Sequence, residues 1–506
     1  GKSDEPVYLL CRDGEIAFRE ASDLWGKDTF ETHDTLRERE GKTAEVACIG
    51  PAGERCVRIS AIMTAGPHGR AAGRCGMGAL MGSKNLKAVV AAGGAKVAVK
   101  DSERLRSFVS SRTKDMVTKS DALGQYGTSV GLQYCERVGD LPIRNWHGRK
   151  FEGAKNIDGP AMASSILTGR YFCGQCVIGC GRTVKVEEGP YSTEGEIGGP
   201  EYETLGMMGS NLLIDDLSAI AKENELCNRY GLDTISTGST IAFAMEAFEE
   251  GILRPEDTGG LELLFGHPGV AVELIHLIGR SEGIGSLLGM GVKEAARRLG
   301  GVSQEFAAHV KGLELPAHDP RSKSSLALGY ATSNRGACHL QAFTHDFEEA
   351  ASLPDMGYPF TLDRKEMEGK AEFVIRFQHL MAMLDSMKCC KFVLFGGMTL
   401  EPLVEALNLV TGMKLSPEEF LKTGERIFNL KRLFNIRCGI SRKDDMLPPR
   451  ILTHSRTFDE DTDELPPLNR MLKEYYSLRG WDEFGRPTPE KIQELNLDGF
   501  VGELKD

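Results

Sequence analysis

Three cysteines stand close together in the segment YFCGQCVIGC: Cys173, Cys176 and Cys180. A C-x2-C-x3-C spacing lets three thiolates reach one centre if a turn begins between them, so the segment predicts a metal site. Two centres fit. Structural zinc takes four Cys or His ligands in a tetrahedron, and a [4Fe–4S] cluster usually takes four thiolates. Neighbouring glycines leave room for a cluster and no second C-x2-C pair follows, so the cluster is favoured over zinc, and both are favoured over three coincidental thiols. The fourth ligand must come from elsewhere.

A glycine-rich segment, GRAAGRCGMGALMGSKNLKA at residues 69–88, predicts a binding site for a phosphate group. It matches neither the dinucleotide fingerprint nor the P-loop, because other residues occupy the positions at which those patterns require Gly or Lys. Four basic residues among exposed backbone amides would make an anion cradle: Arg70, Arg74, Lys84 and Lys87. The alternative is a strand–turn connection whose basic side chains are only solvated.

Two further segments resemble each other, NRYGLDT beginning at Asn228 and DSMKCCK beginning at Asp385. Each places a polar residue five positions before an Asp or a Cys, namely Asp233 and Cys390. Taken alone, Asp233 is as readily a helix cap as a ligand contact. The pair Cys389 and Cys390 could be buried thiols or metal ligands. The recurrence of the pattern beside the cysteine triplet indicates a shared site.

Composition describes the setting. The chain has 506 residues, a net charge of −12 and 13 cysteines. That length predicts two to four domains, and the acidic balance argues against a nucleic-acid surface, which needs a basic face. Cysteine usage is typical of a reducing compartment rather than of a disulfide framework. No apolar run approaches the roughly 20 residues of a membrane span, and the first ten residues lack the order of a signal peptide. We therefore expect a cytoplasmic protein whose partners are small molecules or other proteins.

The apolar pattern changes along the chain from strand-like to helical. Short apolar runs bounded by Gly, Pro or charge predict strands at 7–10, 47–50, 57–60 and 88–91. Beyond residue 101 the pattern is mainly helical. One helix is predicted from Asp216 to Arg229 with Gly231 ending it, and another begins after Asp233 as N-cap and ends at Gly251.

Taken together, these motifs resemble the tungsten-containing aldehyde:ferredoxin oxidoreductases, and the match runs through the whole chain. The motifs that carry it are the glycine-rich segment, CGQCVIGC, GPEYETLG, the two paired segments, YATSNRGACHL and FNIRCGISRKDD. The resemblance implies an α+β fold, with a twisted β-sheet saddle domain followed by two mainly helical domains that enclose a tungsten bis-pyranopterin cofactor. We place these domains at 1–98, 99–305 and 306–506, with the triplet and first pterin motif in the second and the second pterin motif and the fourth cluster cysteine in the third.

The resemblance also assigns cofactor ligands. Cys173, Cys176 and Cys180 would bind a [4Fe–4S] cluster, with Cys390 as the distant fourth ligand. Cys390 is preferred over Cys389 because it stands at the last specified position of its motif, five residues after Asp385.

Further residues would contact the pterins. Asp233 and Asp385 would each hydrogen-bond the ring nitrogens of one pterin. Arg70, Ala71 and Arg74 would lie by the pterin phosphates, with a backbone carbonyl near Ala71 helping to hold a bridging Mg²⁺ ion.

This chain departs from the family pattern in three places. Asn228 replaces an Asp, and Lys388 and Cys389 replace Gly and Leu, so the match is poorest at the pterin contacts carried over to Asn228 and Cys389. The family also begins with a further stretch, about the first half of the β domain, whereas this sequence opens in the middle of that domain. The expectation is either a fragment or a second chain that supplies the missing half.

The implied reaction is a reversible oxidation of aldehydes to carboxylic acids, which removes two electrons and adds oxygen from water. It needs a two-electron metal, a proton acceptor and an exit for single electrons, which would pass through the cluster to ferredoxin or an Fe–S partner subunit of an oligomer. Glu203 is expected to activate water or take a proton, and His339 to polarise the carbonyl. Glu201 and His345 are the second choices for these roles, and Thr234 is expected to line the same cavity.

Two other functions remain open at this stage. A relative in the family reduces aromatic acyl-CoA thioesters with the same cofactor, although GPEYETLG and NRGACHL favour the aldehyde enzymes. A non-catalytic electron-transfer or scaffold subunit is favoured only by the absent N-terminal stretch.

Overall fold

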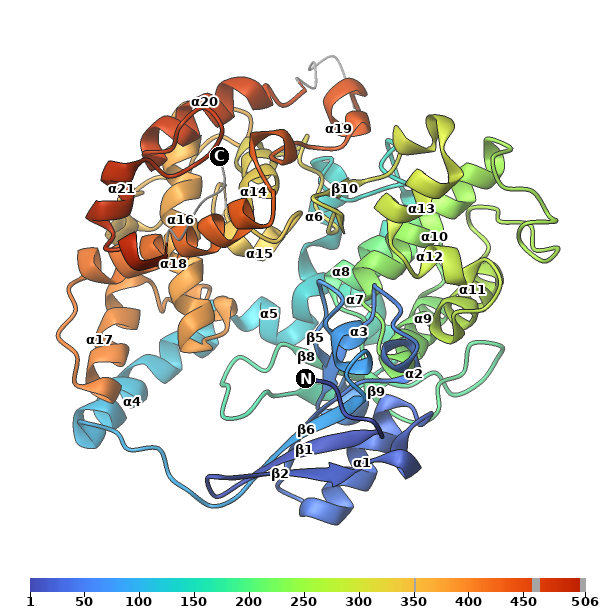
Figure 1. Ribbon diagram of the computed structural model, residues 1–506, viewed down its shortest axis with the longest axis horizontal. Helices are drawn as coiled ribbons and strands as arrows, with labels where there is room; N and C mark the ends of the chain where they lie inside the picture. Colours follow the sequence, from blue (N-terminus) through green and yellow to red (C-terminus); the bar gives the residue numbers. More distant parts are fainter. Residues whose placement is uncertain (350–351, 457–464, 501–506) are drawn as a thin grey trace. The chain divides into compact units, whose positions relative to one another are not determined.

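The computed structural model describes residues 1–349, 352–456 and 465–500, which form two compact units (Figure 1). The first unit comprises Gly1–Lys96 and Gln125–Ala317, and the second comprises Val97–Gly124 and the described part of His318–Asp506. Among the described residues, none of the helices combines the length and apolar character that crossing a membrane requires. The division into three domains by sequence stays a prediction.

A six-stranded sheet forms the N-terminal part of the first unit, in the order β2-β1-β6-β3-β4-β5. β1 and β6 pair in parallel, and the other neighbours pair antiparallel. The strands are β1 (Val7–Arg12), β2 (Glu15–Glu20), β3 (Glu45–Cys48), β4 (Ile62–Thr64), β5 (Arg70–Ala72) and β6 (Leu86–Ala92). The apolar runs at 7–10 and 88–91 fall within β1 and β6, as predicted, and the run at 47–50 overlaps only the end of β3, at Ala47 and Cys48.

The strand predicted at 57–60 is wrong. Val57 and Ile59 are buried as the apolar pattern suggested. The segment nevertheless turns, because the Ser60 N–H donates to the Val57 carbonyl at 3.0 Å. Burial here comes from packing of a turn rather than from a place in the sheet.

Helix α1 (Thr29–Glu40) lies against this sheet (Figure 1). Its start is defined locally by a capping box, in which Asp28 accepts the Glu31 backbone N–H and the Glu31 side chain accepts the Asp28 N–H. The core between helix and sheet is apolar and includes these buried residues: Tyr8, Leu10, Leu24, Leu36, Val46, Ala88 and Val90.

Two small sheets and a set of helices complete the first unit. β7 (Leu167–Tyr171), β8 (Gly181–Val184) and β9 (Ile197–Gly198) form one antiparallel sheet, and β10 (His309–Val310) pairs with β11 (Leu313–Glu314). The helices are α2 (Pro51–Glu54), α3 (Met77–Gly82), α6 (Leu132–Arg137), α7 (Gly159–Ser165), α8 (Tyr202–Thr204), α9 (Leu217–Tyr230), α10 (Thr234–Glu249), α11 (Pro268–Arg280), α12 (Gly285–Leu288) and α13 (Val292–Leu299).

Both helices predicted in this part are confirmed with their caps. The Asp216 carboxylate accepts the backbone N–H groups of Ser218 and Ala219 at the start of α9. Asp233 accepts the Ile235 N–H at the start of α10. These bonds satisfy donors that have no partner within the helix.

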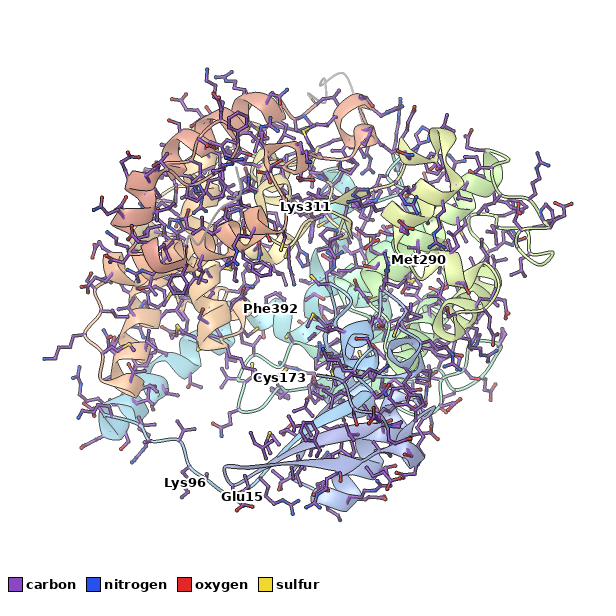
Figure 2. The ribbon with its side chains drawn as sticks, viewed as in Figure 1. Glu15, Lys96, Cys173, Met290, Lys311 and Phe392 are labelled. Carbon is purple, nitrogen blue, oxygen red and sulfur yellow. The ribbon has the colours of Figure 1, made fainter. Side chains whose placement is uncertain are left out.

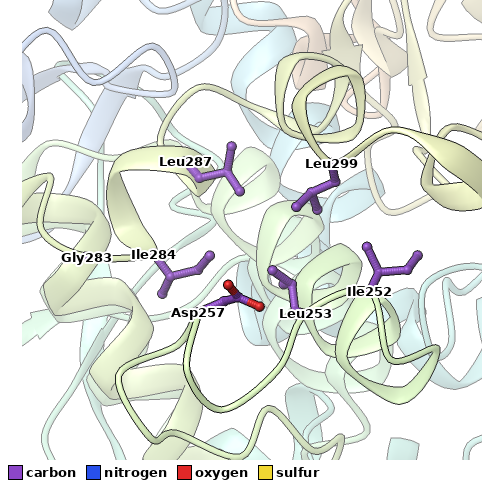
Figure 3. A pocket seen from close by; sticks show the side chains of 7 residues that line it. All are labelled: Ile252, Leu253, Asp257, Gly283, Ile284, Leu287 and Leu299. Carbon is purple, nitrogen blue, oxygen red and sulfur yellow. The ribbon is translucent and has the colours of Figure 1, made fainter.

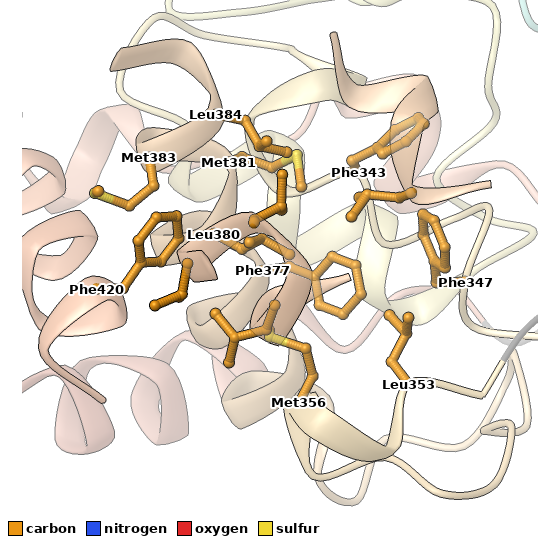
Figure 4. Close-up of a cluster of buried hydrophobic side chains, with 14 of the residues drawn as sticks. Phe343, Phe347, Leu353, Met356, Phe377, Leu380, Met381, Met383, Leu384 and Phe420 are labelled. Carbon is orange, nitrogen blue, oxygen red and sulfur yellow. The ribbon is translucent and has the colours of Figure 1, made fainter. Parts of the chain in front are cut away.

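The second unit is helical among its described residues. An apolar core surrounds α16 (Lys370–Met387), where Phe377, Leu380, Met381 and Leu384 pack against Phe343 and Phe347 (Figure 4). The other helices are α4 (Ser102–Lys119), α14 (Ser324–Thr332), α15 (His339–Ala342), α17 (Leu400–Thr411), α18 (Pro417–Arg437), α19 (Pro449–Thr453), α20 (Leu468–Arg479) and α21 (Pro489–Glu494), and α5 (Asp121–Tyr126) spans the boundary between the units.

Candidate functional site

The cysteine triplet lies on the loop of residues 172–180 that connects β7 to β8, and Figure 2 labels Cys173 on it. Cys173 is exposed, Cys176 and Cys180 are half-buried, and none of the three is in a disulfide. The Cys176 N–H donates to the Cys173 carbonyl at 2.9 Å, which is the tight turn that the C-x2-C spacing requires. Three thiols on one short loop therefore present a donor set suited to an iron–sulfur cluster.

Arg70 provides a positive charge beside these thiols. A Cβ atom placed on Gly181, the residue after Cys180, would lie 2.6 Å from Arg70 Nη2, so the glycine is what allows the guanidinium to approach the loop. Burial disfavours the charge, but Glu201 and the thiols of Cys173 and Cys180 raise the pKa of Arg70 above its ordinary value. A permanent cation at this place suits a cluster held by thiolates, which is anionic.

Glu201 connects Arg70 to the segment GPEYETLG. Arg70 Nη1 lies 2.6 Å from Glu201 Oε1, and the Thr128 hydroxyl donates to Glu201 Oε2 at 2.6 Å. The Thr128 oxygen in turn accepts the Tyr202 N–H at 2.9 Å. Both Glu201 oxygens are thus engaged, and its placement fits orientation of Arg70 better than proton transfer.

Glu203 lies two residues further on, in α8. Its Oε2 atom accepts the backbone N–H of Ala317 at 2.7 Å, and the Tyr202 hydroxyl donates to the Ala317 carbonyl at 2.7 Å. A π-helical turn, η5 (Leu205–Gly209), follows α8 directly. Such turns often occur at functional sites, and this one gives the segment a shape that the sequence pattern did not indicate.

The first paired motif lies at the C-terminus of α9. Gly231 has φ of 71°, in the left-handed region that costs glycine little, and the Leu232 N–H donates to the Cys227 carbonyl at 2.8 Å. This is a Schellman ending, with Asn228 in the last helical turn and Asp233 two residues beyond the glycine.

The second paired motif has the same geometry at the C-terminus of α16. Lys388 has φ of 53°, and the Cys389 N–H donates to the Leu384 carbonyl at 2.9 Å. Asp385 therefore takes the place of Asn228, and Cys390 takes the place of Asp233. The two similar segments thus share one backbone motif. Its left-handed position is Gly231 in the first segment and Lys388 in the second, and Lys is more strained than Gly in that conformation.

Asp233 is both a helix cap and the centre of a buried polar group. Its Oδ2 atom accepts the Ser236 hydroxyl at 2.7 Å and lies 3.3 Å from Arg74 Nε, and its Oδ1 atom accepts the Ile235 N–H at 3.1 Å. The side chains of Arg74 and Asp233 are only 8% and 7% exposed. Arg74 and Asp233, predicted separately as phosphate and pterin contacts, are thus brought together.

The remaining members of the predicted anion cradle differ. Lys87 is fully buried and forms an ion pair with Glu54, so the prediction that it faces a ligand is wrong. Lys84 is at the surface, where its Nζ atom donates to the Gly1 carbonyl at 3.3 Å. The cradle is therefore limited to the arginines on and next to β5.

The surroundings of β5 fit a polar ligand. Ala71 is exposed in the middle of this strand, which is the last in the sheet order. Two buried nitrogen atoms nearby, Arg70 Nε and His68 Nδ1, have no hydrogen-bond partner among the described residues. Buried polar atoms without partners are uncommon in folded proteins, and a separate polar molecule such as a pterin phosphate would supply the missing hydrogen-bond partners.

Three histidines meet in the second unit. His339, at the start of α15, and His345 have ring centroids 5.8 Å apart, and His318 lies 5.7 Å and 4.2 Å from them. His339 is half-buried, whereas His345 is 2% exposed and also packs edge-on against Phe343. His339 is therefore the more accessible of the two predicted histidines, and His318 joins them without having been predicted.

A pocket of about 280 Å³ lies elsewhere in the first unit (Figure 3). Its lining is mainly aliphatic, with Asp257 as the acidic member, and that carboxylate accepts the Arg254 N–H at 3.0 Å. No residue predicted from the sequence lines it.

Two family descriptions match the chain. "Aldehyde ferredoxin oxidoreductase, N-terminal domain" covers residues 1–93, and "Aldehyde ferredoxin oxidoreductase, domains 2 & 3" covers residues 106–497. The chain belongs to the aldehyde ferredoxin oxidoreductase family. Its α+β fold, with an N-terminal β domain followed by helical domains, is that of the family, as predicted.

Several relatives are similar over almost the whole chain. The tungsten-containing aldehyde ferredoxin oxidoreductase of Pyrococcus abyssi is 41% identical over 99% of this chain and 81% of its own length. The protein of the same name from Pyrococcus furiosus is 39% identical with the same coverage. The aliphatic sulfonate oxidoreductase, WOR-like subunit, of P. furiosus is 31% identical over 100% of this chain and 80% of its own.

A solved structure shows the same fold. The active site complex BamBC of benzoyl coenzyme A reductase, in complex with 1,5 dienoyl-CoA, has a TM-score of 0.81 and covers 99% of this chain and 81% of its own. At 22% identity this likeness concerns the fold alone.

The structure adds polar residues that sequence reasoning missed. Thr128 and Ser236 carry no motif, and each becomes visible only through its bond to a predicted carboxylate. His318 had a weak signal, since it stands in the segment HDP a few residues before α14, which begins at Ser324.

Proposed function

We propose that the protein oxidises aldehydes reversibly to carboxylic acids. In this proposal a tungsten bis-pyranopterin performs the chemistry, and electrons leave through a [4Fe–4S] cluster to ferredoxin or a partner subunit. The observation that carries the proposal is the 38–41% identity, over 99% of the chain, to four proteins named tungsten-containing aldehyde ferredoxin oxidoreductase.

The chain's own residues fit the cofactors. Cys173, Cys176 and Cys180 would hold the cluster with Cys390 as fourth ligand, and Arg70 would balance its negative charge. The triplet belongs to the first unit and Cys390 to the second, and their sharing of one cluster is part of the proposal.

The pterins would be held by residues at the two Schellman endings and on β5. Asp233 and Asp385 would accept from pterin N–H groups, with Asn228, Thr234 and Cys389 nearby. Arg70, Ala71 and Arg74 would face the phosphates, and a carbonyl near Ala71 would bind a bridging Mg²⁺, a hard cation that prefers oxygen ligands. When bound, the tungsten cofactor supplies two-electron redox chemistry, and the protein supplies position and proton transfer.

Glu203 would take a proton from water or substrate, and His339 would donate a hydrogen bond to the aldehyde oxygen. The contact from the Ala317 N–H fixes one Glu203 oxygen and thereby orients the carboxylate. Glu201 and His345 stay the second choices. The engagement of Glu201 with Arg70 and Thr128, and the deeper burial of His345, favour Glu203 and His339. Cytoplasmic location, an oligomeric state and the three-domain division are likewise proposals.

Metal analysis joined to turnover tests this function. The protein is purified without oxygen, tungsten and iron are counted per chain, and reduction of ferredoxin or a viologen dye is followed with an aldehyde. Tungsten with four irons and aldehyde-dependent reduction are expected. Iron without tungsten would favour an electron-transfer subunit instead. A tungsten-loaded protein that turns over an aromatic acyl-CoA and no aldehyde would overturn the proposal.

A further inference from the structure

Glu314, on β11, is a buried carboxyl group to which the proposed reaction gives no role. Glu314 is only 2% exposed. Its Oε1 atom accepts the Val292 N–H at 2.9 Å, and its Oε2 atom lies 2.8 Å from the Ser236 hydroxyl oxygen. Ser236 is 78 positions away in the sequence, so only the fold brings them together.

The same hydroxyl contacts a second carboxylate. Ser236 Oγ lies 2.7 Å from Asp233 Oδ2 as well as 2.8 Å from Glu314 Oε2. A hydroxyl has one proton to donate, and an ionised carboxylate only accepts. One proton cannot satisfy both oxygens. The arrangement is complete if one carboxyl is protonated and donates to Ser236 Oγ, while the serine donates to the other.

The surroundings decide which carboxyl keeps the proton. Asp233 faces the guanidinium of Arg74 at 3.3 Å and the N-terminus of α10 through the Ile235 N–H, and both favour its charged form. Arg74 meets Glu314 through the backbone, where Nη2 donates to the carbonyl oxygen at 2.7 Å. With Glu314 neutral, the Arg74 and Asp233 charges balance, whereas an ionised Glu314 would leave a net negative charge in a buried group, which is costly.

Burial raises the pKa of Glu314 above its ordinary value, although Ser236, Arg74 and the Val292 N–H oppose that change. His309 pairs with Glu314 across β10 and β11, and Lys293 follows Val292 on α13. Burial and then Lys293 lower the pKa of His309 to about 4, so this histidine is neutral where Glu314 titrates.

We propose that Glu314 carries a proton at neutral pH and, through Ser236, holds Asp233 as the charged acceptor for the pterin. The second half of this statement rests on the proposed function of Asp233. Glu314 is thus a positioning residue, two hydrogen bonds away from Asp233 and three away from the pterin that Asp233 would hold. Loss of its proton at alkaline pH places two carboxylates against one hydroxyl, which loosens Asp233 and lowers cofactor retention.

Infrared spectroscopy tests the proton directly. A neutral carboxyl group absorbs apart from the backbone bands, and ¹³C-labelled glutamate moves a Glu band while leaving an Asp band in place. At pH 7 the parent is expected to show a neutral Glu band that is absent from Glu314→Gln. The same band should shift in Ser236→Ala, because its hydrogen-bond partner is gone. Two results would overturn the assignment. One is neutral-carboxyl absorption that is unchanged in Glu314→Gln, and the other is a neutral band that does not shift with labelled glutamate and is lost in Asp233→Asn.

Glu223→Gln is the matched control for this measurement. Glu223 is also fully buried in the first unit, burial and Asp216 raise its pKa well above its ordinary value, and neither carboxylate oxygen has a hydrogen-bond partner among the described residues. The control variant should lose its own neutral band and keep that of Glu314.

Cofactor retention tests the link to Asp233. Holoenzyme is incubated over a range of alkaline pH values, passed through a desalting column and analysed for tungsten. At the pH where the parent and Glu223→Gln retain half of their tungsten, Glu314→Gln should retain nearly all, because glutamine stays neutral. A parental loss curve in Glu314→Gln would overturn the link. A protein that binds no tungsten would contradict the proposed function, while the infrared result would still decide where the proton lies.

Discussion

Replacement of Asp233 by Asn is the sharpest test of the pterin contacts. Asn preserves the size of the side chain and is about as good an N-cap as Asp. Its amide oxygen can still accept the Ile235 N–H, now 3.1 Å from Oδ1. Arg74 keeps its bond to the Glu314 carbonyl. The variant is therefore expected to fold with α10 intact.

The cost should fall on cofactor binding. A carboxylate offers two charged acceptor atoms, whereas the amide offers one neutral acceptor and places an NH₂ group toward the ligand. A hydrogen bond to a charged group contributes about 1.5–3 kcal/mol. At 1.4 kcal/mol for each factor of ten, the affinity for the cofactor should fall by roughly 10- to 150-fold.

The assay counts tungsten per chain after extended dialysis, with thermal unfolding of the same samples. Asp216→Asn is the matched control, because Asp216 also caps a helix of the first unit by accepting two backbone N–H groups and belongs to neither paired motif. Tungsten should fall in Asp233→Asn and remain parental in Asp216→Asn, with similar unfolding temperatures in both. Full loading of Asp233→Asn would contradict the proposed pterin contact and leave Asp233 as a helix cap alone.

Three other predictions concern the cluster, the catalytic pair and the pH dependence of stability. Cys390→Ser should remove iron and the paramagnetic signal of the reduced cluster, whereas Cys389→Ser should keep both; the reverse result would make Cys389 the fourth ligand. Glu203→Gln and His339→Asn should each lower turnover by about 10²–10⁴-fold with tungsten and iron content unchanged, and a loaded variant with parental turnover would remove that residue from the mechanism. Burial and Asp216 raise the pKa of Glu223 well above its ordinary value of 4.5, so the folded chain keeps a proton that the unfolded chain loses. The free energy of unfolding should therefore fall as pH rises above about 4.5, by up to about 1.4 kcal/mol per pH unit. Denaturant titrations of Glu223→Gln should show a smaller decline, and an identical decline would mean that Glu223 is ionised when folded.

Much of the fold could be predicted from short stretches of sequence. The capped starts of α9 and α10 and the glycine that ends α9 were predicted because a cap is decided within one turn of chain. The turn inside the cysteine triplet follows from its spacing in the same way. The likeness of the paired motifs was also visible, since a Schellman ending involves only six consecutive residues.

Tertiary packing decided what short stretches could not. Residues 57–60 have the apolar pattern of a strand and form a turn, because burial can satisfy apolar side chains in either conformation. Lys87 stands in a basic segment and is withdrawn from it by Glu54, 33 positions away. A residue type and its neighbours in sequence do not reveal a distant partner.

The candidate site likewise has features that the sequence predicts and features that depend on tertiary packing. The thiols, the two paired motifs and the acid and histidine candidates could all be identified from the sequence, because spacing within a motif is a property of the chain. Only the tertiary structure placed Arg70 against Gly181 and Glu201, and joined Asp233 to Glu314 through Ser236. Charge balance and proton sharing act over a few ångströms of space, so they depend on which distant segments the fold brings into contact.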